Sequence, residues 1–205
     1  MKIKEEGWNI VLVGKWNKYI LSPEWSAQNI FGVDRVNVEF GINVDVPPRY
    51  TANNVNLVAS EDIVIFSYKK YDDETLDNAV NACTSLLNKL PFTPVAACGI
   101  NFGFSEGIQD SNIGNLFSFD DDDRLISFGS VITSKSVSRK LTIRDRILNF
   151  NVSKDNEQID FSFNFHYDVK SCEGVETAIG SLKDNLEIAR GILQDIYGLV
   201  IDAEE

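Results

Sequence analysis

The chain contains a single histidine, and the residues around it could support acid–base chemistry. His166 and Asp168 stand two positions apart in the segment IDFSFNFHYDV, residues 159–169. Residues two apart on a β-strand share one face and lie about 6.5–7 Å apart along it. A carboxylate at that distance could orient the imidazole and raise its pKa, as a general base requires. Because no nucleophile stands nearby in sequence, a solvated histidine on the wet face of a strand is the favoured alternative.

Cys172 is a second candidate, because it follows Ser171 at the predicted start of the last helix. A helix N-terminus can lower a thiol pKa, and His166 on the preceding strand could lie within reach. The alternative is a partly buried thiol at a helix cap, favoured because no further nucleophile signature surrounds it. The chain has three cysteines and no CxxC pair, so neither a disulfide framework nor a zinc site is indicated. No metal or cofactor is predicted.

Two other patterns have a structural and a functional interpretation. Asp120 to Asp123 could attract a hard cation, but the calcium-loop spacing is absent and a charged turn is favoured. Gly99, Asn101 and Gly103 alternate with larger apolar residues along a predicted strand. Small residues on one strand face indicate that something packs closely there, namely the other half of the chain, a second subunit or a ligand.

The charge balance bears on the choice of partner. There are 19 basic and 31 acidic residues, a net charge of −12. Such a chain repels phosphate backbones, so direct nucleic-acid binding is not expected. The basic segment 134–146 (Lys135, Arg139, Lys140, Arg144 and Arg146) would be split between two strand faces, which is typical of a charged hairpin edge. An alternative function that would account for this negative charge is that of an acidic inhibitor that imitates DNA.

The same composition indicates where the protein works. No segment approaches the roughly 18 apolar residues of a membrane span, and the N-terminus lacks the features of a signal peptide. With its few, widely spaced cysteines, the chain is expected in a reducing, cytoplasmic setting without membrane contact.

The elements that position these residues follow from hydrophobic periodicity. In the first half, strands are predicted over 8–16, 36–46, 54–60 and 62–70. The strand over 36–46 alternates cleanly, with Val36, Val38, Phe40, Ile42, Val44 and Val46 on one face. A short helix is expected between an N-cap at Ser22 and a C-terminal Gly32, and a long one over 72–90 with a continuous apolar stripe.

The second half repeats this order. A strand is predicted over 93–104, a short helix over 105–119, and strands over 124–134, 139–153 (two strands around a turn) and 158–169. A long helix ends the chain, with one apolar face: Val175, Ala178, Ile179, Leu182, Leu186, Ala189, Leu193 and Ile196.

Both halves therefore run strand, short helix, strands, long helix. We expect an α+β fold of two similar β-α-β-β-β-α halves, residues 1–92 and 93–205, either as two units or as one continuous domain. They would share one antiparallel sheet with the two long helices on one face. This order of elements resembles the duplicated saddle of TATA-binding proteins.

The resemblance implies a saddle with an open face but not the family's function. Those proteins press a basic, Phe-bearing face into the minor groove. Here the corresponding positions are polar or acidic: Asn37, Glu39, Asn43, Asp45, Asp160, Asn164 and Asp168.

The leading functional hypothesis is a non-catalytic protein-binding module that uses the open polar face of its sheet. The expected binding residues are Asn37, Glu39, Asn43, Asp45, Asn101, Asn164 and His166. One alternative is a small enzyme or ligand-binding protein with a pocket between the halves, using His166, Asp168 and Cys172. Another is an assembly protein that self-associates by pairing exposed strands.

Overall fold

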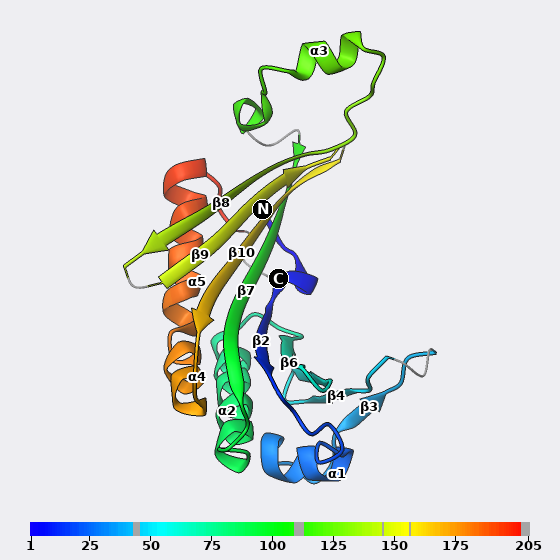
Figure 1. Ribbon diagram of the computed structural model, residues 1–205, viewed down its shortest axis with the longest axis vertical. Coiled ribbons are helices and arrows are strands. Elements are labelled where there is room, and N and C mark those ends of the chain that lie inside the picture. Colours follow the sequence, from blue (N-terminus) through cyan, green and yellow to red (C-terminus); the bar gives the residue numbers. More distant parts are fainter. Residues whose placement is uncertain (43–45, 109–112, 145, 156, 202–205) are drawn as a thin grey trace.

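The computed structural model describes residues 1–42, 46–108, 113–144, 146–155 and 157–201. These residues form an α+β fold around one large, open antiparallel sheet of 10 strands (Figure 1). The predicted α+β class and antiparallel sheet are confirmed.

The first half of the chain supplies six strands and the first long helix. The strands are β1 (Lys2–Ile3), β2 (Asn9–Gly14), β3 (Asn37–Glu39), β4 (Arg49–Ala52), β5 (Val55–Ala59) and β6 (Ile63–Tyr68). A 3₁₀ turn, η1 (Glu5–Gly7), separates β1 from β2. The helices are α1 (Pro23–Ser26), which continues into the π-helical turn η2 (Ala27–Phe31), and α2 (Asp73–Lys89).

The second half supplies four longer strands and the C-terminal helices. The strands are β7 (Val95–Gly107), β8 (Lys135–Ile143), β9 (Arg146–Lys154) and β10 (Gln158–Asp168). Between β7 and β8 lie η4 (Gly114–Phe117) and α3 (Asp122–Ser127). The chain ends with α4 (Cys172–Ile179), α5 (Leu182–Gly191) and η5 (Ile192–Ile196).

The sheet is centred on the pair formed by β2 and β7. Its strands follow the order β3-β4-β5-β6-β2-β7-β10-β9-β8, with β1 also paired to β7. In the first half, the last strand β6 therefore lies beside the central β2. In the second half, the last strand β10 lies beside the central β7.

One face of the sheet is covered by helices, whereas the other is largely exposed, apart from the buried Thr51 and Asn56. On β10, the phenylalanines at 161, 163 and 165 are at most 1% exposed, and Trp8, Ile100 and Phe102 join them in the same core. Helix α2 contacts β5 and β6, and α4 and α5 contact β7. These helices lie on one side of the sheet (Figure 1). The alternation predicted for residues 159–169 is confirmed, and we call the opposite side the open face.

Helix starts agree with the sequence. The Ser22 side chain accepts a hydrogen bond from the Trp25 N–H, and Gly32 ends the helical turn with a φ of 63°. Asp72 accepts from the Thr75 N–H in the same way at the start of α2. Each side chain satisfies an N–H group that the first helical turn leaves unpaired, which fixes where the helix begins.

One predicted strand is shorter than expected, and another is replaced by a helix. The pairing of β3 with β4 ends at Glu39 and Arg49, so the predicted strand over 36–46 stops there. Phe40 and Ile42 are strongly exposed instead of facing the core. Asn43, Val44 and Asp45 lie outside the described residues. The predicted strand over 124–134 is replaced by α3, which the left-handed Gly129 follows at a φ of 93°.

Two helix predictions also need correction. Over 105–119, β7 continues to Gly107 and only Gly114–Phe117 is helical. The C-terminal helix divides at Gly180 and Ser181 into α4 and α5. Its apolar face is buried as far as Leu193, but Ile196 is 70% exposed.

The glycine alternation on β7 has a structural cause at Gly103. The carbonyl of Gly103 accepts hydrogen bonds from the Lys4 N–H at 2.9 Å and from Trp8 Nε1 at 2.7 Å. These bonds hold η1 against the open face of β7. A Cβ on Gly103 would lie 2.9 Å from the Cα of Gly7 and 3.1 Å from the Lys4 carbonyl. The chain's own N-terminal turn therefore occupies this position.

Replacing Gly103 with alanine is expected to destabilise the protein by about 1–3 kcal/mol, because the added methyl group meets rigid backbone atoms. Thermal or chemical unfolding measures the loss. Gly99→Ala is the matched control on the same strand face, since its Cβ would meet no backbone atom and come closest to the end of one side chain, the Asn164 amide at 3.1 Å. Its expected effect is within about 0.5 kcal/mol. Equal losses in the two variants would contradict this explanation of the glycines.

Candidate functional site on the open face of the sheet

A row of polar residues crosses the open face at one level. Strand pairing places these residues directly opposite one another, from β3 to β8: Asn37, Thr51, Asn56, Ser67, Asn9, Asn101, Asn164, Asn149 and Lys140. Residues opposite each other in antiparallel strands lie on the same face with their side chains in contact range. We call this set the polar row.

The four central asparagines form a continuous chain of side-chain hydrogen bonds. Asn149 donates to Asn164 at 2.9 Å, Asn164 donates to Asn101 at 2.6 Å, and Asn101 donates to Asn9 at 2.8 Å. Asn9 in turn donates to the Glu6 carbonyl at 3.3 Å. These four residues, the amide row, join β2, β7, β10 and β9.

The amide row keeps unused hydrogen-bonding capacity. A side-chain amide has two N–H donors and two acceptor lone pairs. Asn101 uses one donor toward Asn9 and one acceptor toward Asn164, and Asn164 is used in the same way. One donor and one acceptor remain on each, at the inter-strand spacing of about 4.8 Å. The row is both internally fixed and able to bind a polar partner.

Asn101→Ala is expected to cost about 1–2 kcal/mol of unfolding free energy, because Asn9 and Asn164 both lose a partner in a partly buried setting. Urea denaturation measures the change. Asn149→Ala is the control at the exposed end of the row, where a single donated bond is lost, and its expected cost is below about 0.5 kcal/mol. A larger loss for Asn149→Ala than for Asn101→Ala would contradict the amide-row account.

His166 and Asp168 meet on the open face beside the polar row. His166 Nε2 lies 3.1 Å from Asp168 Oδ1, so the predicted proximity is present. The His166 side chain is 36% exposed and the Asp168 side chain 82% exposed. His166 stands opposite Gly99 on β7 and Ile147 on β9. The pair is therefore a solvated one on an open surface.

Cys172 lies on the other side of the sheet from His166. It begins α4, as predicted, and its thiol points toward the carbonyls of Leu90 at 3.7 Å and Thr93 at 3.8 Å. Burial, with the nearby negative charge of Glu176, raises the pKa of the Cys172 thiol. The structure does not bring Cys172 together with His166, and the pKa direction is opposite to that of an activated nucleophile.

The three thiols should resist alkylation in the folded protein. All are buried, and burial raises the pKa of Cys83 and Cys172 and takes that of Cys98 to about 12. At pH 8 the thiolate is therefore scarce and shielded. Mass spectrometry after iodoacetamide treatment should show an unmodified native chain and a triply modified one in denaturant. Rapid native modification at Cys172 would reopen the nucleophile hypothesis.

The remaining predicted binding residues are divided between the ends of the sheet. Asn37 belongs to the polar row at β3, while Glu39 on the same strand forms an ion pair with Arg49 at 3.3 Å. Strand β3 lies six strands from β10, about 29 Å at the usual strand spacing. Asn37 and Glu39 are therefore not part of one compact site with His166. Asn43 and Asp45 fall outside the described residues.

A group of aliphatic side chains adjoins the amide row on the first half of the sheet. We call it the Val/Ile patch: Val11, Val13, Val58, Ile63 and Ile65. Val13 and Ile63 are opposite each other and 36% and 38% exposed. Apolar side chains next to unsatisfied amides form the mixed surface found in protein–protein contacts.

The open face is nearly balanced in charge. Asp160 pairs with Lys4 at 2.5 Å, and Glu39 pairs with Arg49 at 3.3 Å. The negative charge of Asp168 is matched in number by the positive charge of Lys140 on the same face. The acidic residues that dominate the composition lie largely on other surfaces, such as α2 and the segment 120–123. A partner on this face would therefore be recognised by hydrogen bonds and apolar contact more than by charge.

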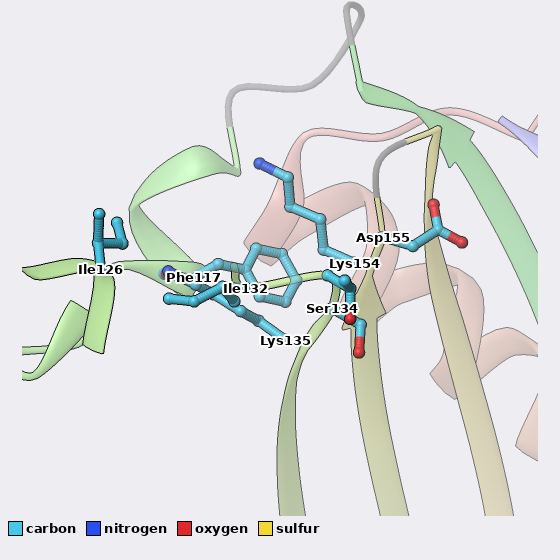
Figure 2. A pocket seen from close by; sticks show the side chains of 8 residues that line it. Phe117, Ile126, Ile132, Ser134, Lys135, Lys154 and Asp155 are labelled. Carbon is cyan, nitrogen blue, oxygen red and sulfur yellow. The ribbon is translucent and has the colours of Figure 1, made fainter. Parts of the chain in front are cut away.

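A cavity of about 320 Å³ lies away from this face, where the segment before β8 meets the ends of β8 and β9 (Figure 2). Its lining includes Phe117, Ile132 and Lys154, with the Lys154 ammonium 5.9 Å from the centre of the Phe117 ring. Neither His166 nor Cys172 lines it.

Within the described ranges, no group of three or more His, Cys, Asp or Glu side chains is placed to hold a metal ion. No helix of the described chain is both long and apolar enough to cross a membrane. In sequence comparisons, no protein-family model and no curated protein matches the chain.

Sequence reasoning found Asn101 and Asn164 but missed Asn9 and Asn149. Both missed residues occupy polar positions in alternating strands, in the segments WNIVLV and ILNFNVS. That signal shows which face they occupy. Their contact with Asn101 and Asn164 depends on strand register, which no local pattern specifies.

Proposed function

We propose that this protein is a non-catalytic binding module that holds a protein partner on the open face of its sheet. The observation that carries the proposal is the amide row, a fixed line of asparagines with spare donors and acceptors on a face that α2, α4 and α5 do not cover. The Val/Ile patch beside it supplies apolar area. Such a surface fits a largely neutral protein face with its own polar groups.

The order of strands supports a second part of the proposal, that the two halves are copies arranged as a saddle. On both sides of the β2–β7 pair, the last strand of each half comes next, followed by the earlier strands in reverse. This arrangement is what an internal duplication resembling the saddle of TATA-binding proteins would produce. The near-neutral open face supports a protein partner in place of nucleic acid.

The His166–Asp168 pair favours an alternative, a small enzyme or ligand-binding site. An imidazole 3.1 Å from a carboxylate could act as a base. The pair lies exposed on the sheet, and all three thiols of the chain are buried. His166→Asn would abolish activity under this alternative, whereas it would leave a binding module folded.

The binding proposal predicts that the substitution Val13→Arg weakens binding of the partner. The arginine would place a charge at the most exposed pair of the Val/Ile patch, Val13 and Ile63, where apolar contact is required. We expect immobilised wild-type protein to retain a specific partner from native lysate. The immobilised variant should retain at least about tenfold less of that partner. Quantitative mass spectrometry of the bound fraction provides the measurement.

Ile196→Arg is the matched control, because Ile196 is an exposed aliphatic residue on η5, away from the open face. It should retain the partner fully. Binding should also persist in high salt, whereas a DNA-mimic inhibitor would release its partner. Retention by Val13→Arg, or loss by Ile196→Arg, would contradict binding through the open face.

A further inference from the structure

The outer edge of β8 is an unpaired sheet edge. Strand β8 spans nine residues and is the last strand in the sheet order, so no strand of the described chain pairs with its outer side. An edge of this length presents a line of backbone N–H and C=O groups that can accept another strand. At the opposite end of the sheet, β3 spans only three residues. The β8 edge is therefore the larger opening for strand addition.

The edge is basic from its middle to its C-terminal end and acidic beyond its N-terminal end. Arg139 at the middle of β8, Lys140 next to it and Arg144 just after the strand are all exposed. Beyond its N-terminal end, the connection over residues 113–134, which we call the arm, carries Asp120, Asp121 and Asp123, also exposed. None of these six side chains forms an ion pair within the described residues.

The arm is anchored at β8 but has little core of its own. Lys135 pairs with Asp122 and donates to the Phe117 carbonyl at 2.8 Å, which fixes the arm to the first residue of β8. The arm extends beyond the sheet (Figure 1). Its exposed apolar side chains are Phe119, Leu125, Ile126, Phe128 and Val131, with Phe128 90% exposed. A fixed segment with this much exposed apolar surface is typical of an interaction site.

We infer that the partner of this edge is a second copy of the chain. Two identical edges related by a two-fold axis pair antiparallel, so the N-terminal end of each β8 meets the C-terminal end of the other. The acidic arm of one copy then lies against the basic end of the other, twice in the dimer. This arrangement gives the unpaired charged side chains opposite charges as partners, and it gives the backbone groups of the β8 edge a strand to pair with.

The positions of the basic residues select a register. Pairing centred on Ser138 places Arg139 opposite Val137 and Lys140 opposite Ser136. Pairing centred on Arg139 or on Lys140 would place like charges directly opposite, which is destabilising. The Ser138 register adds seven residue pairs to the ladder, over residues 135–141 of each copy, and keeps the helices of both copies on one side of a continuous sheet.

The same register brings the cavity near the arm close to the second copy. Ile132 and Asp155 line the 320 Å³ cavity at the N-terminal end of β8, and Arg144 follows the C-terminal end of the second copy's β8, which meets that end (Figure 2). The aliphatic part of an arginine can pack on Phe117 and Ile132 while its guanidinium approaches a carboxylate. This contact lies at the arm and leaves the open face free, so the inference is independent of the proposed function.

Solution mass with a charge exchange tests the dimer. Wild-type protein should have twice the 23.0 kDa chain mass by light scattering at micromolar concentration. The arm variant (D120K, D121K and D123K) and the edge variant (R139E, K140E and R144E) should each be monomeric, because arm and edge then carry like charges. An equal mixture of the two should recover the dimer, since each arm again meets an opposite edge. Asp122 is kept because it anchors the arm.

A disulfide provides a readout that does not depend on the charge variants folding well. Ser138→Cys places a thiol on the proposed two-fold axis, and mild oxidation should cross-link it to its own copy. Ser162→Cys on the open face of β10 is the control and should stay monomeric. A monomeric wild type that forms no Ser138→Cys cross-link would overturn the inference. So would a dimer that both charge variants leave intact.

Discussion

The pairing of β2 with β7 at the middle of the sheet is the contact on which the rest of the structure depends. It joins the two halves into one sheet and brings Asn9 opposite Asn101. The close approach of Gly7 to Gly103, with two hydrogen bonds to the Gly103 carbonyl, holds the chain just before this pair. A shift of one residue between these strands would reverse their faces and break the amide row.

That register gives the two faces of the sheet different roles. One face buries Phe161, Phe163 and Phe165 under the C-terminal helices, and the hydrophobic effect makes it the source of stability. The other face is freed from packing, and its polar side chains satisfy one another through the amide row. Because these amides are already fixed in position, a partner would bind without the entropic cost of ordering them.

The sequence patterns predicted the features that depend on residues close in sequence and missed those that depend on strand pairing. The cap at Ser22, the apolar stripe of the helix over 72–90 and the alternation over 159–169 each rest on residues a few positions apart, and all are present. The alternation over 36–46 is as regular, yet in the described part of this segment the pairing ends at Glu39. At the site, His166 and Asp168 were found because they are two residues apart. Asn9 and Asn149 were missed, because their contacts span the sheet.

Site-specific photo-crosslinking tests most directly the claim that one face folds the protein and the other binds. A photoreactive residue replaces Ser162, exposed on the open face of β10, or Asn81, exposed on α2. Illumination in native lysate should give one specific protein adduct from position 162 and none from position 81. Adducts from position 81 alone would place the binding surface on the helices and contradict the account.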